Sequence, residues 1–274
     1  MVFSFIQTSL VFPGSVMQGT AAVQVQPSSD EELGRLETAS GAHVAALFGR
    51  ATSSHESDDV SSRVPTLLFF YGNGDSMRNV RSLFEMFRGM GVNVAVADYV
   101  GYGMSTGKPS EQGCYETAEA VYDWVQTLPG VDPNRIIIGG WSLGSGVAID
   151  LAAKKQPAGL LIVSPFTKLA DVGRMHYPLL PVNLFLRHRF NSLEKIARVK
   201  CPIVIAHGRN DDIIPSSMAE KLAEAAGGPV DLFVVDGVGH GFFVPRSQQK
   251  FAESFERLRT TVMQRETSPS DSGR

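Results

Sequence analysis

Ser142 has the sequence setting of a catalytic nucleophile. It stands at the centre of Gly140-Trp-Ser-Leu-Gly144, a complete Gly-x-Ser-x-Gly pattern. In this pattern the serine occupies a sharp turn between a strand and a helix, where a strained backbone makes the hydroxyl project outward. Small residues two positions before and after the serine avoid a steric clash, and glycine stands at both. The pattern therefore predicts that Ser142 attacks a substrate carbonyl group.

A serine hydroxyl is a weak nucleophile at neutral pH, so it needs a general base and an acid that orients the base. On a doubly wound sheet the acid and then the histidine follow the serine in chain order, each in a loop after a later strand. Asp211 and Asp212 follow the apolar run 203–206, and His240 follows the apolar run 232–235. We predict His240 as the base and one of the two aspartates as the acid.

The other candidates for base and acid are less favourable. His207 lies at the buried end of a strand, which is typical of a structural histidine. Asp236 stands only four residues before His240 in one loop, which leaves its carboxylate little room to reach the Nδ1 side of that ring. The remaining histidines lie too early in the chain for the expected order: His43, His55, His176 and His188.

The tetrahedral intermediate of acyl transfer also needs N–H donors for its oxyanion, each worth typically about 3 kcal/mol. One is the backbone N–H of the residue after the nucleophile, here Leu143. The second usually comes from the loop after an earlier strand, and the loop 71–75 follows the apolar run 66–70. We predict the backbone N–H of Asn73 as this donor. The alternative is that the glycines of the loop only make a tight turn.

The glycine-rich stretch 139–146 is also compatible with a loop that holds a phosphate at a helix start. A dinucleotide fingerprint would place a third glycine at position 149, which is Ile149. A second glycine-rich stretch contains Gly107-Lys108, but Pro109 stands where a Ser or Thr would bind magnesium. Both patterns are incomplete, which disfavours nucleotide binding.

The elements that must position these residues alternate between short apolar runs and amphipathic stretches. Strands are expected at 66–70, 92–97, 135–138, 160–163, 203–206 and 230–235, and helices at 77–90, 117–128, 144–155, 216–226 and 248–263. Continuous Val, Ile and Leu runs are typical of strands buried on both faces, and a regular alternation implies a parallel sheet. We predict an α/β fold with a doubly wound, mostly parallel sheet of about eight strands. Residues 44–48 predict an antiparallel hairpin at one edge.

The chain divides into an N-terminal extension over 1–30, a domain over 31–264 and a tail over 265–274. The tail is rich in Ser, Pro, Asp and Gly and is predicted to be disordered. Residues 166–200 interrupt the alternation and are too long for an ordinary connection, so we expect a small cap insertion over the carboxyl edge of the sheet. The polar residues 53–62 are expected to form an exposed loop.

The composition of the chain limits the classes of partner that it is expected to bind. The chain has 274 residues, of which 43% are hydrophobic, and a formal net charge of −3. Such a chain can bury a large core, and it lacks the basic surface that binding to nucleic acid requires. Two cysteines provide neither a disulfide framework nor a thiolate cluster for zinc. No apolar run reaches 18 residues, so we expect a cytoplasmic or peripheral membrane protein of undetermined oligomeric state.

The first twelve residues are hydrophobic in the manner of a signal peptide, yet Arg35 is the first basic residue, so the charged start of a secretory signal is missing. Three interpretations stay open for this segment. It packs on the domain, it makes a peripheral contact with a membrane surface, or it is a leader that is removed.

Five motifs in order resemble those of the alpha/beta-hydrolase superfamily, over about residues 36–263. They are Tyr71-Gly-Asn-Gly, the stretch from Asp98 to Glu111, Gly140-Trp-Ser-Leu-Gly, His207-Gly-Arg-Asn-Asp211 with Ile214-Pro215, and Gly239-His240. The chain is most similar to the lipase-like branch that contains small-capped, often membrane-associated proteins and the protein depalmitoylases. In that family the acid is the fourth residue after the His of the His-Gly motif, which selects Asp211. The resemblance implies a structural role for Asp98, and Tyr71 stands where members commonly carry His.

The expected reaction is hydrolysis of a carboxylic ester or thioester through an acyl-enzyme on Ser142, with no metal or cofactor. The expected substrate is a small-molecule or lipid-like acyl compound. An amidase or peptidase of the same fold and a non-catalytic binding scaffold are the alternatives. The pocket wall is expected to include Tyr71, Trp141, Met175, Tyr177, Leu180 and Phe185. The cap residues among them fit an acyl-chain lining and ordinary cap core equally well.

Overall fold

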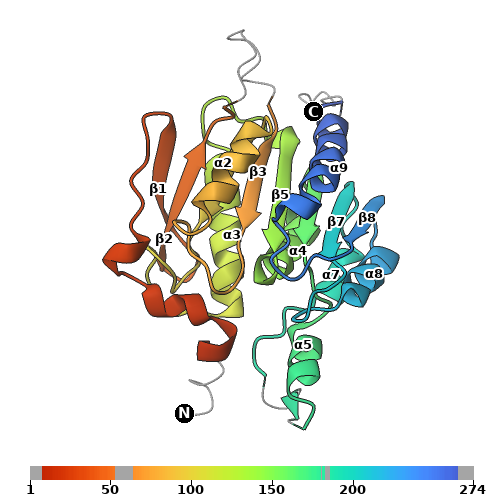
Figure 1. The fold of residues 1–274 in the computed structure, drawn as a ribbon. Coiled ribbons are helices and arrows are strands. Elements are labelled where there is room, and N and C mark those ends of the chain that lie inside the picture. Colours follow the sequence, from red (N-terminus) through yellow and green to blue (C-terminus); the bar gives the residue numbers. More distant parts are fainter. Residues whose placement is uncertain (1–7, 53–63, 180, 183–185, 265–274) are drawn as a thin grey trace, which may run out of the picture.

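Eight strands join into one sheet in this computed structural model, which describes residues 8–52, 64–179, 181–182 and 186–264 (Figure 1). The strands are β1 (Glu31–Glu37), β2 (His43–Gly49), β3 (Thr66–Phe70), β4 (Asn93–Ala97), β5 (Ile136–Trp141), β6 (Gly159–Val163), β7 (Ile203–Gly208) and β8 (Val230–Val235). Their order across the sheet is β1-β2-β4-β3-β5-β6-β7-β8. From β4 to β8 all pairs are parallel. The predicted fold class is confirmed.

One edge of the sheet is antiparallel. β1 pairs antiparallel with β2, with Glu37 opposite His43, and β2 pairs antiparallel with β4. A tight turn at Gly41, with φ of 79°, joins the first two strands. The hairpin expected at the sheet edge is therefore confirmed.

Helices cover both faces of the sheet. They are α2 (Arg81–Gly89), α3 (Glu111–Val125), α4 (Leu143–Lys155), α5 (Leu169–His176), α7 (Ser192–Ile196), α8 (Ser216–Ala225) and α9 (Pro245–Met263). Leu67 and Phe69 of β3 belong to one core, which α2 and α9 cover. Leu68 and Phe70 belong to the other, which α3, α4 and α8 cover. Alternate residues of one strand thus enter two cores, as expected for a strand buried on both faces.

Hydrogen bonds to side chains explain two differences from the predicted helix boundaries. α3 begins at Glu111, six residues before the predicted start, because the Ser110 hydroxyl accepts a hydrogen bond from the Gly113 N–H at 2.9 Å. α2 begins at Arg81, four residues after the predicted start. The N–H of Met77 donates instead to the Asp98 carboxylate at 2.7 Å, which holds the preceding residues in a non-helical turn.

Residues 8–30 pack against the domain near the carboxyl ends of the strands (Figure 1). Phe12, Val23 and Val25 are buried there. Between β6 and β7 the chain forms α5 and α7, and α5 projects beyond the carboxyl edge of the sheet (Figure 1). Among the described residues, no helix is long and apolar enough to cross a membrane. The expectations for 53–62 and 265–274 lie outside the described residues.

Candidate active site

Ser142 occupies the strained turn between β5 and α4. Its backbone has φ of 54° and ψ of −120°, a conformation that side-chain-bearing residues rarely adopt. A Cβ at Gly140 would lie 2.1 Å from the Gly144 carbonyl oxygen, and a Cβ at Gly144 would lie 1.9 Å from the Phe70 carbonyl oxygen. Only glycine fits at either position, so the spacing of the motif is a steric requirement of this turn.

Two hydrogen bonds join the three residues predicted to form a triad. His240 Nε2 lies 2.9 Å from Ser142 Oγ, and His240 Nδ1 lies 2.8 Å from Asp211 Oδ2. Asp211 follows β7 and His240 follows β8, so both side chains come from the carboxyl edge of the sheet. This is the geometry in which a histidine can accept the serine proton while a carboxylate orients the ring.

The surroundings of Asp211 favour its ionised form. Its Oδ1 accepts hydrogen bonds from the N–H groups of Ile213 at 2.9 Å and Ile214 at 2.8 Å. Burial alone would raise the pKa of Asp211, but hydrogen bonds from His207, His240 and Ile214 outweigh it and hold that pKa well below its usual range. The carboxylate therefore carries a full negative charge behind His240 at neutral pH.

In the part of the chain that the structure describes, neither Asp212 nor Asp236 forms a hydrogen bond or ion pair with His240. Asp212 is exposed, and the Asp236 carboxylate accepts from Arg209 Nε at 3.4 Å.

His207 is buried and holds the loop that carries Asp211. Its Nε2 lies 2.8 Å from the Ile214 carbonyl oxygen and 3.2 Å from Asp211 Oδ2. Within the described residues its Nδ1 has no partner, which favours the tautomer that carries the proton on Nε2. The structural interpretation from the sequence fits this position, but it missed the contact with the carboxylate of Asp211. The four-residue spacing between the two was the available signal.

Trp141 braces the loop of His240. Its indole N–H donates to the His240 carbonyl oxygen at 3.3 Å, and the two rings are 6.0 Å apart. The ring also lies near the loop 71–75, since a Cβ at Gly72 would be 3.7 Å from Trp141 Cε3. Trp141 is half-buried beside Ser142, a position compatible with the predicted pocket wall.

The two predicted oxyanion donors belong to segments next to Ser142. Leu143 is the first residue of α4, so its N–H has no partner within the helix. The loop 71–75 lies beside the serine, because a Cβ at Gly72 would be 3.6 Å from Ser142 Cβ. Asn73 accepts at its carbonyl oxygen and donates from its side chain. None of its hydrogen bonds within the described residues uses its backbone N–H.

Tyr71 does not line a substrate pocket, so this expectation is wrong. The side chain is fully buried, and its hydroxyl donates to Asp98 Oδ1 at 2.8 Å. Burial and the neighbouring Asp98 carboxylate raise the pKa of Tyr71 well above its usual value, so the phenol stays protonated as a donor. Tyr71 therefore supports the loop 71–75 from the core.

Met175 and Tyr177 are half-exposed, on α5 and directly after it. Met175 borders a cavity of about 400 Å³ whose lining includes Thr167, Asp171 and Met218 but none of the triad residues. The structure does not bring these two side chains together with Ser142. Leu180 and Phe185 lie outside the described residues.

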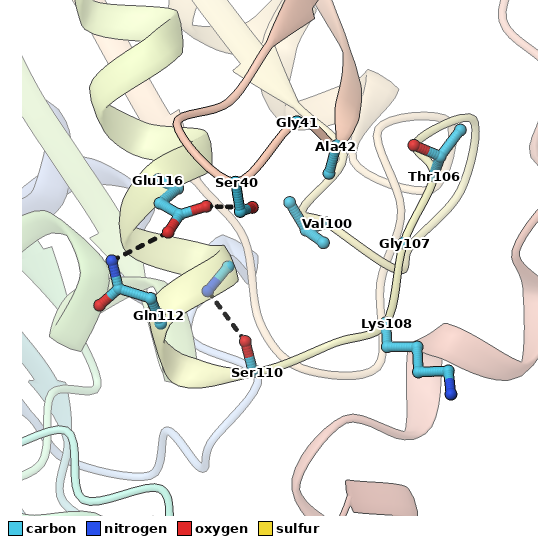
Figure 2. A pocket seen from close by; sticks show the side chains of 11 residues that line it. Ser40, Gly41, Ala42, Val100, Thr106, Gly107, Lys108, Ser110, Gln112 and Glu116 are labelled. Atoms are coloured by element: carbon cyan, nitrogen blue, oxygen red, sulfur yellow. Dashed lines mark hydrogen bonds between the residues drawn. The ribbon is translucent and has the colours of Figure 1, made fainter.

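The second glycine-rich stretch borders a separate cavity of about 410 Å³ between the β1–β2 turn and the start of α3 (Figure 2). The Ser110 hydroxyl already caps the Gly113 N–H. Glu116 accepts from the Ser40 hydroxyl and from Gln112 Nε2, and Lys108 extends away from these groups (Figure 2). This arrangement pairs the polar groups with each other, unlike a phosphate-binding loop, in which backbone N–H groups converge on the ligand.

Residues 102–265 contain Ser142, Asp211 and His240 and match the profile of the dienelactone hydrolase family. The chain belongs to this family. The superfamily assignment made from the motifs is thereby confirmed.

This chain is similar to an alpha/beta hydrolase domain-containing protein 17B from Xenopus laevis. It is 30% identical over 228 residues, which cover 83% of this chain and 73% of that protein. An uncharacterized protein of Mycobacterium tuberculosis is 42% identical over 176 residues, 64% of this chain. The match spans 63% of the length of that mycobacterial protein.

Solved structures share the fold. An esterase of Pyrococcus furiosus superimposes with a TM-score of 0.70 at 18% identity, covering 88% of this chain and 96% of the esterase. A Thermogutta terrifontis esterase with bound propionate gives a TM-score of 0.64 at 21% identity, covering 85% of this chain and 95% of that one. At these sequence identities the similarity establishes the fold of this chain alone.

Gly144→Ala tests the steric requirement of the turn. We expect the free energy of unfolding to fall by about 3 kcal/mol or more, because the added Cβ would collide with the Phe70 carbonyl oxygen. Gly89→Ala is the matched control, since Gly89 is exposed at the end of α2 with open space around its Cβ position. It should raise stability by about 0.5 kcal/mol. Urea unfolding of both variants measures the difference. Equal stabilities would contradict the steric argument.

Asp211→Asn tests the charge on the acid. The folded-state pKa lies below the unfolded value, so the charge stabilises the fold above about pH 4 and this contribution is lost as pH falls toward the folded pKa. We expect the variant to lose about 1–2 kcal/mol at pH 7, with the difference from wild type shrinking below about pH 4.

Urea unfolding between pH 3 and pH 7 measures this dependence. Asp212→Asn is the control, because Asp212 is exposed, and it should change stability by less than about 0.5 kcal/mol. A difference for Asp211→Asn that stays constant over this pH range would contradict the lowered pKa.

Proposed function

We propose that this chain is a serine hydrolase that cleaves carboxylic esters or thioesters through an acyl-enzyme intermediate. One observation carries the proposal. A continuous pair of hydrogen bonds runs from Ser142 Oγ through His240 to Asp211, at 2.9 and 2.8 Å, and starts at a serine held in a strained turn. Membership of the dienelactone hydrolase family supports hydrolysis as the reaction.

Acylation begins when Ser142 Oγ attacks the acyl carbonyl carbon and His240 Nε2 accepts the hydroxyl proton. The Asp211 carboxylate stabilises the imidazolium that forms. The N–H groups of Leu143 and Asn73 hold the oxyanion of the tetrahedral intermediate. Collapse of the intermediate breaks the bond to the leaving group, and the imidazolium gives its proton to the departing alkoxide or thiolate.

Deacylation repeats the same proton transfers with water. His240 Nε2 accepts a proton from a water molecule as its oxygen attacks the acyl-enzyme carbonyl. The second tetrahedral intermediate then releases the carboxylic acid, and Ser142 Oγ recovers its proton from the imidazolium. Every proton in this cycle passes through His240, and no metal or cofactor takes part.

Esters and thioesters are the preferred substrates because their leaving groups need less help from a general acid than the amine of a peptide. The sequence also offers no clear acidic cluster to capture a free amino terminus. The fold supports several reaction subtypes, so an amidase of the same triad is the principal alternative. A small-molecule or lipid-like acyl compound is the proposed substrate class.

Labelling with a fluorophosphonate probe tests the nucleophile. We expect one adduct per chain on the wild type and none on Ser142→Ala, because only an activated serine reacts. Ser217→Ala, which removes an exposed serine of α8, should label like the wild type. An unlabelled wild type would favour the non-catalytic scaffold, and labelling of Ser142→Ala would assign the nucleophile elsewhere.

A matched series of esters, thioesters and amides with acyl chains of increasing length tests the substrate class. We expect kcat/KM for the amides to be lower than for the esters by about 100-fold or more, and Ser142→Ala to reduce ester turnover by about 10⁴-fold or more. Steady-state kinetics at fixed pH measures both. Amide hydrolysis as fast as ester hydrolysis would support the amidase alternative instead.

A further inference from the structure

The N-terminal segment binds directly to the predicted oxyanion loop. We call residues 11–19 the N-terminal strap and residues 71–75 the oxyanion loop. The Gly14 N–H donates to the Asn73 carbonyl oxygen at 3.0 Å, and the Asn73 side-chain amide donates back to the Val11 carbonyl oxygen at 3.1 Å. The residue whose N–H is proposed to bind the oxyanion is thus held by the strap through both its backbone and its side chain.

The two backbones are in close contact at Gly14. A Cβ there would lie 2.9 Å from the Asp75 carbonyl oxygen, 3.0 Å from the Asn73 carbonyl oxygen and 2.7 Å from Tyr102 Cε1. Gly14 is buried. There is no room for a side chain between the strap and the oxyanion loop, so an added methyl group must move one of them.

The strap is itself anchored to the rest of the domain. Phe12 is fully buried, with its ring 4.9 Å from the His188 ring and 6.3 Å from the Phe190 ring of the cap insertion. Gln18 Nε2 donates to the Ser105 carbonyl oxygen at 2.8 Å, and the Gly19 N–H donates to the Gly103 carbonyl oxygen at 2.8 Å.

These anchors span the insertion between β6 and β7 and the loop after β4. The strap therefore connects three parts of the carboxyl edge, one of which is the oxyanion loop beside Ser142.

Tyr102 completes the attachment. Its hydroxyl donates to the Asn73 carbonyl oxygen at 3.0 Å, alongside the Gly14 N–H, so this oxygen accepts from two directions. Fixing the carbonyl and the side chain of Asn73 restricts the backbone dihedrals of that residue. The position of its N–H relative to Ser142 follows from those dihedrals, and oxyanion stabilisation depends steeply on the placement of the donor.

We propose that the N-terminal strap is a positioning element for the oxyanion donor at Asn73, with Gly14 and Phe12 as its positioning residues. The inference rests on the serine hydrolase function proposed above. It assigns the strap a part in transition-state stabilisation, beyond packing on the domain. Displacing the strap should weaken binding of the oxyanion while leaving the triad and ground-state substrate binding intact.

Three variants of the full chain test the proposal, and each alters a different contact of the strap. Gly14→Ala forces the strap and the oxyanion loop apart, Phe12→Ala removes the anchor in the cap, and Asn73→Ala keeps the backbone N–H but removes the amide bond to Val11. Leu10→Ala is the control, because Leu10 is exposed and immediately precedes the strap.

Two kinetic constants and one inhibition constant are the readouts, with a short-chain ester as substrate. We expect kcat to fall by about ten- to a hundredfold in the three variants, with KM within about twofold of the wild type. The inhibition constant of a trifluoromethyl ketone, whose adduct carries the oxyanion, should rise by a similar factor. Leu10→Ala should match the wild type in all three constants.

Active-site titration with the fluorophosphonate separates positioning from unfolding, because kcat is then expressed per reactive serine. If kcat per reactive serine and the ketone inhibition constant stay within twofold of the wild type in Phe12→Ala and Asn73→Ala, the positioning role is overturned. If the wild type itself is neither labelled nor inhibited by the ketone, the proposed function fails and the inference fails with it. An active wild type with unimpaired variants overturns the inference alone.

Discussion

The strained backbone of Ser142 is the constraint on which the rest of the site depends. A serine at φ of 54° between β5 and α4 requires the first turn of the helix to pass close to the end of the neighbouring strand, where a Cβ at Gly144 would touch the Phe70 carbonyl oxygen. The end of β3 is therefore packed directly against the nucleophile turn. The loop that follows β3 must begin beside Ser142, and this adjacency allows it to supply a second oxyanion donor.

Asp98 supports that loop from the core. Its buried carboxylate accepts hydrogen bonds from the Tyr71 hydroxyl at 2.8 Å, the Met77 N–H at 2.7 Å and the Met104 N–H at 2.8 Å. A buried carboxylate without such donors would be costly, so the three bonds fix the loops after β3 and β4 relative to each other. Gly103 completes the packing, since a Cβ there would lie 2.0 Å from Asp98 Oδ2.

The sequence was sufficient for features that follow from local pattern and parallel-sheet geometry. Apolar runs located the strands. Because the carboxyl ends of parallel strands lie at one edge, the loops after β7 and β8 were expected near the end of β5. Asp211 and His240 were therefore expected near Ser142. Features that depend on the direction of a side chain could not be predicted in this way. A tyrosine in an oxyanion loop can point toward the substrate or toward a buried carboxylate, and the sequence alone did not connect Tyr71 with Asp98.

The contacts of His207 and of the N-terminal residues were missed for a related reason. A hydrophobic start of a chain has the same composition whether it packs, inserts or is removed, so composition could not predict the contact between Gly14 and the backbone of Asn73. The helix starts differed because Ser110 and Asp98 are capping and accepting groups whose partners lie three or more residues away. The Ser110 bond is a local helix cap and the Asp98 bond is a tertiary contact, and hydrophobic periodicity encodes neither of them.

Asp75 and Asp211, two carboxylates of the site, differ in how their surroundings act on the charge. Burial raises the pKa of Asp75, whose carboxylate lies beside Gly72 on the oxyanion side, since a Cβ on that glycine would be 3.5 Å from Asp75 Oδ2. Burial would do the same to Asp211, but hydrogen bonds led by those from His207 and His240 outweigh it and lower its pKa. Asp211, whose charge is stabilised by these hydrogen bonds, is also the carboxylate bonded to His240, at 2.8 Å. In the proposed mechanism, a proton that moves from Ser142 Oγ to His240 therefore moves toward a stabilised negative charge, and this favours the transfer.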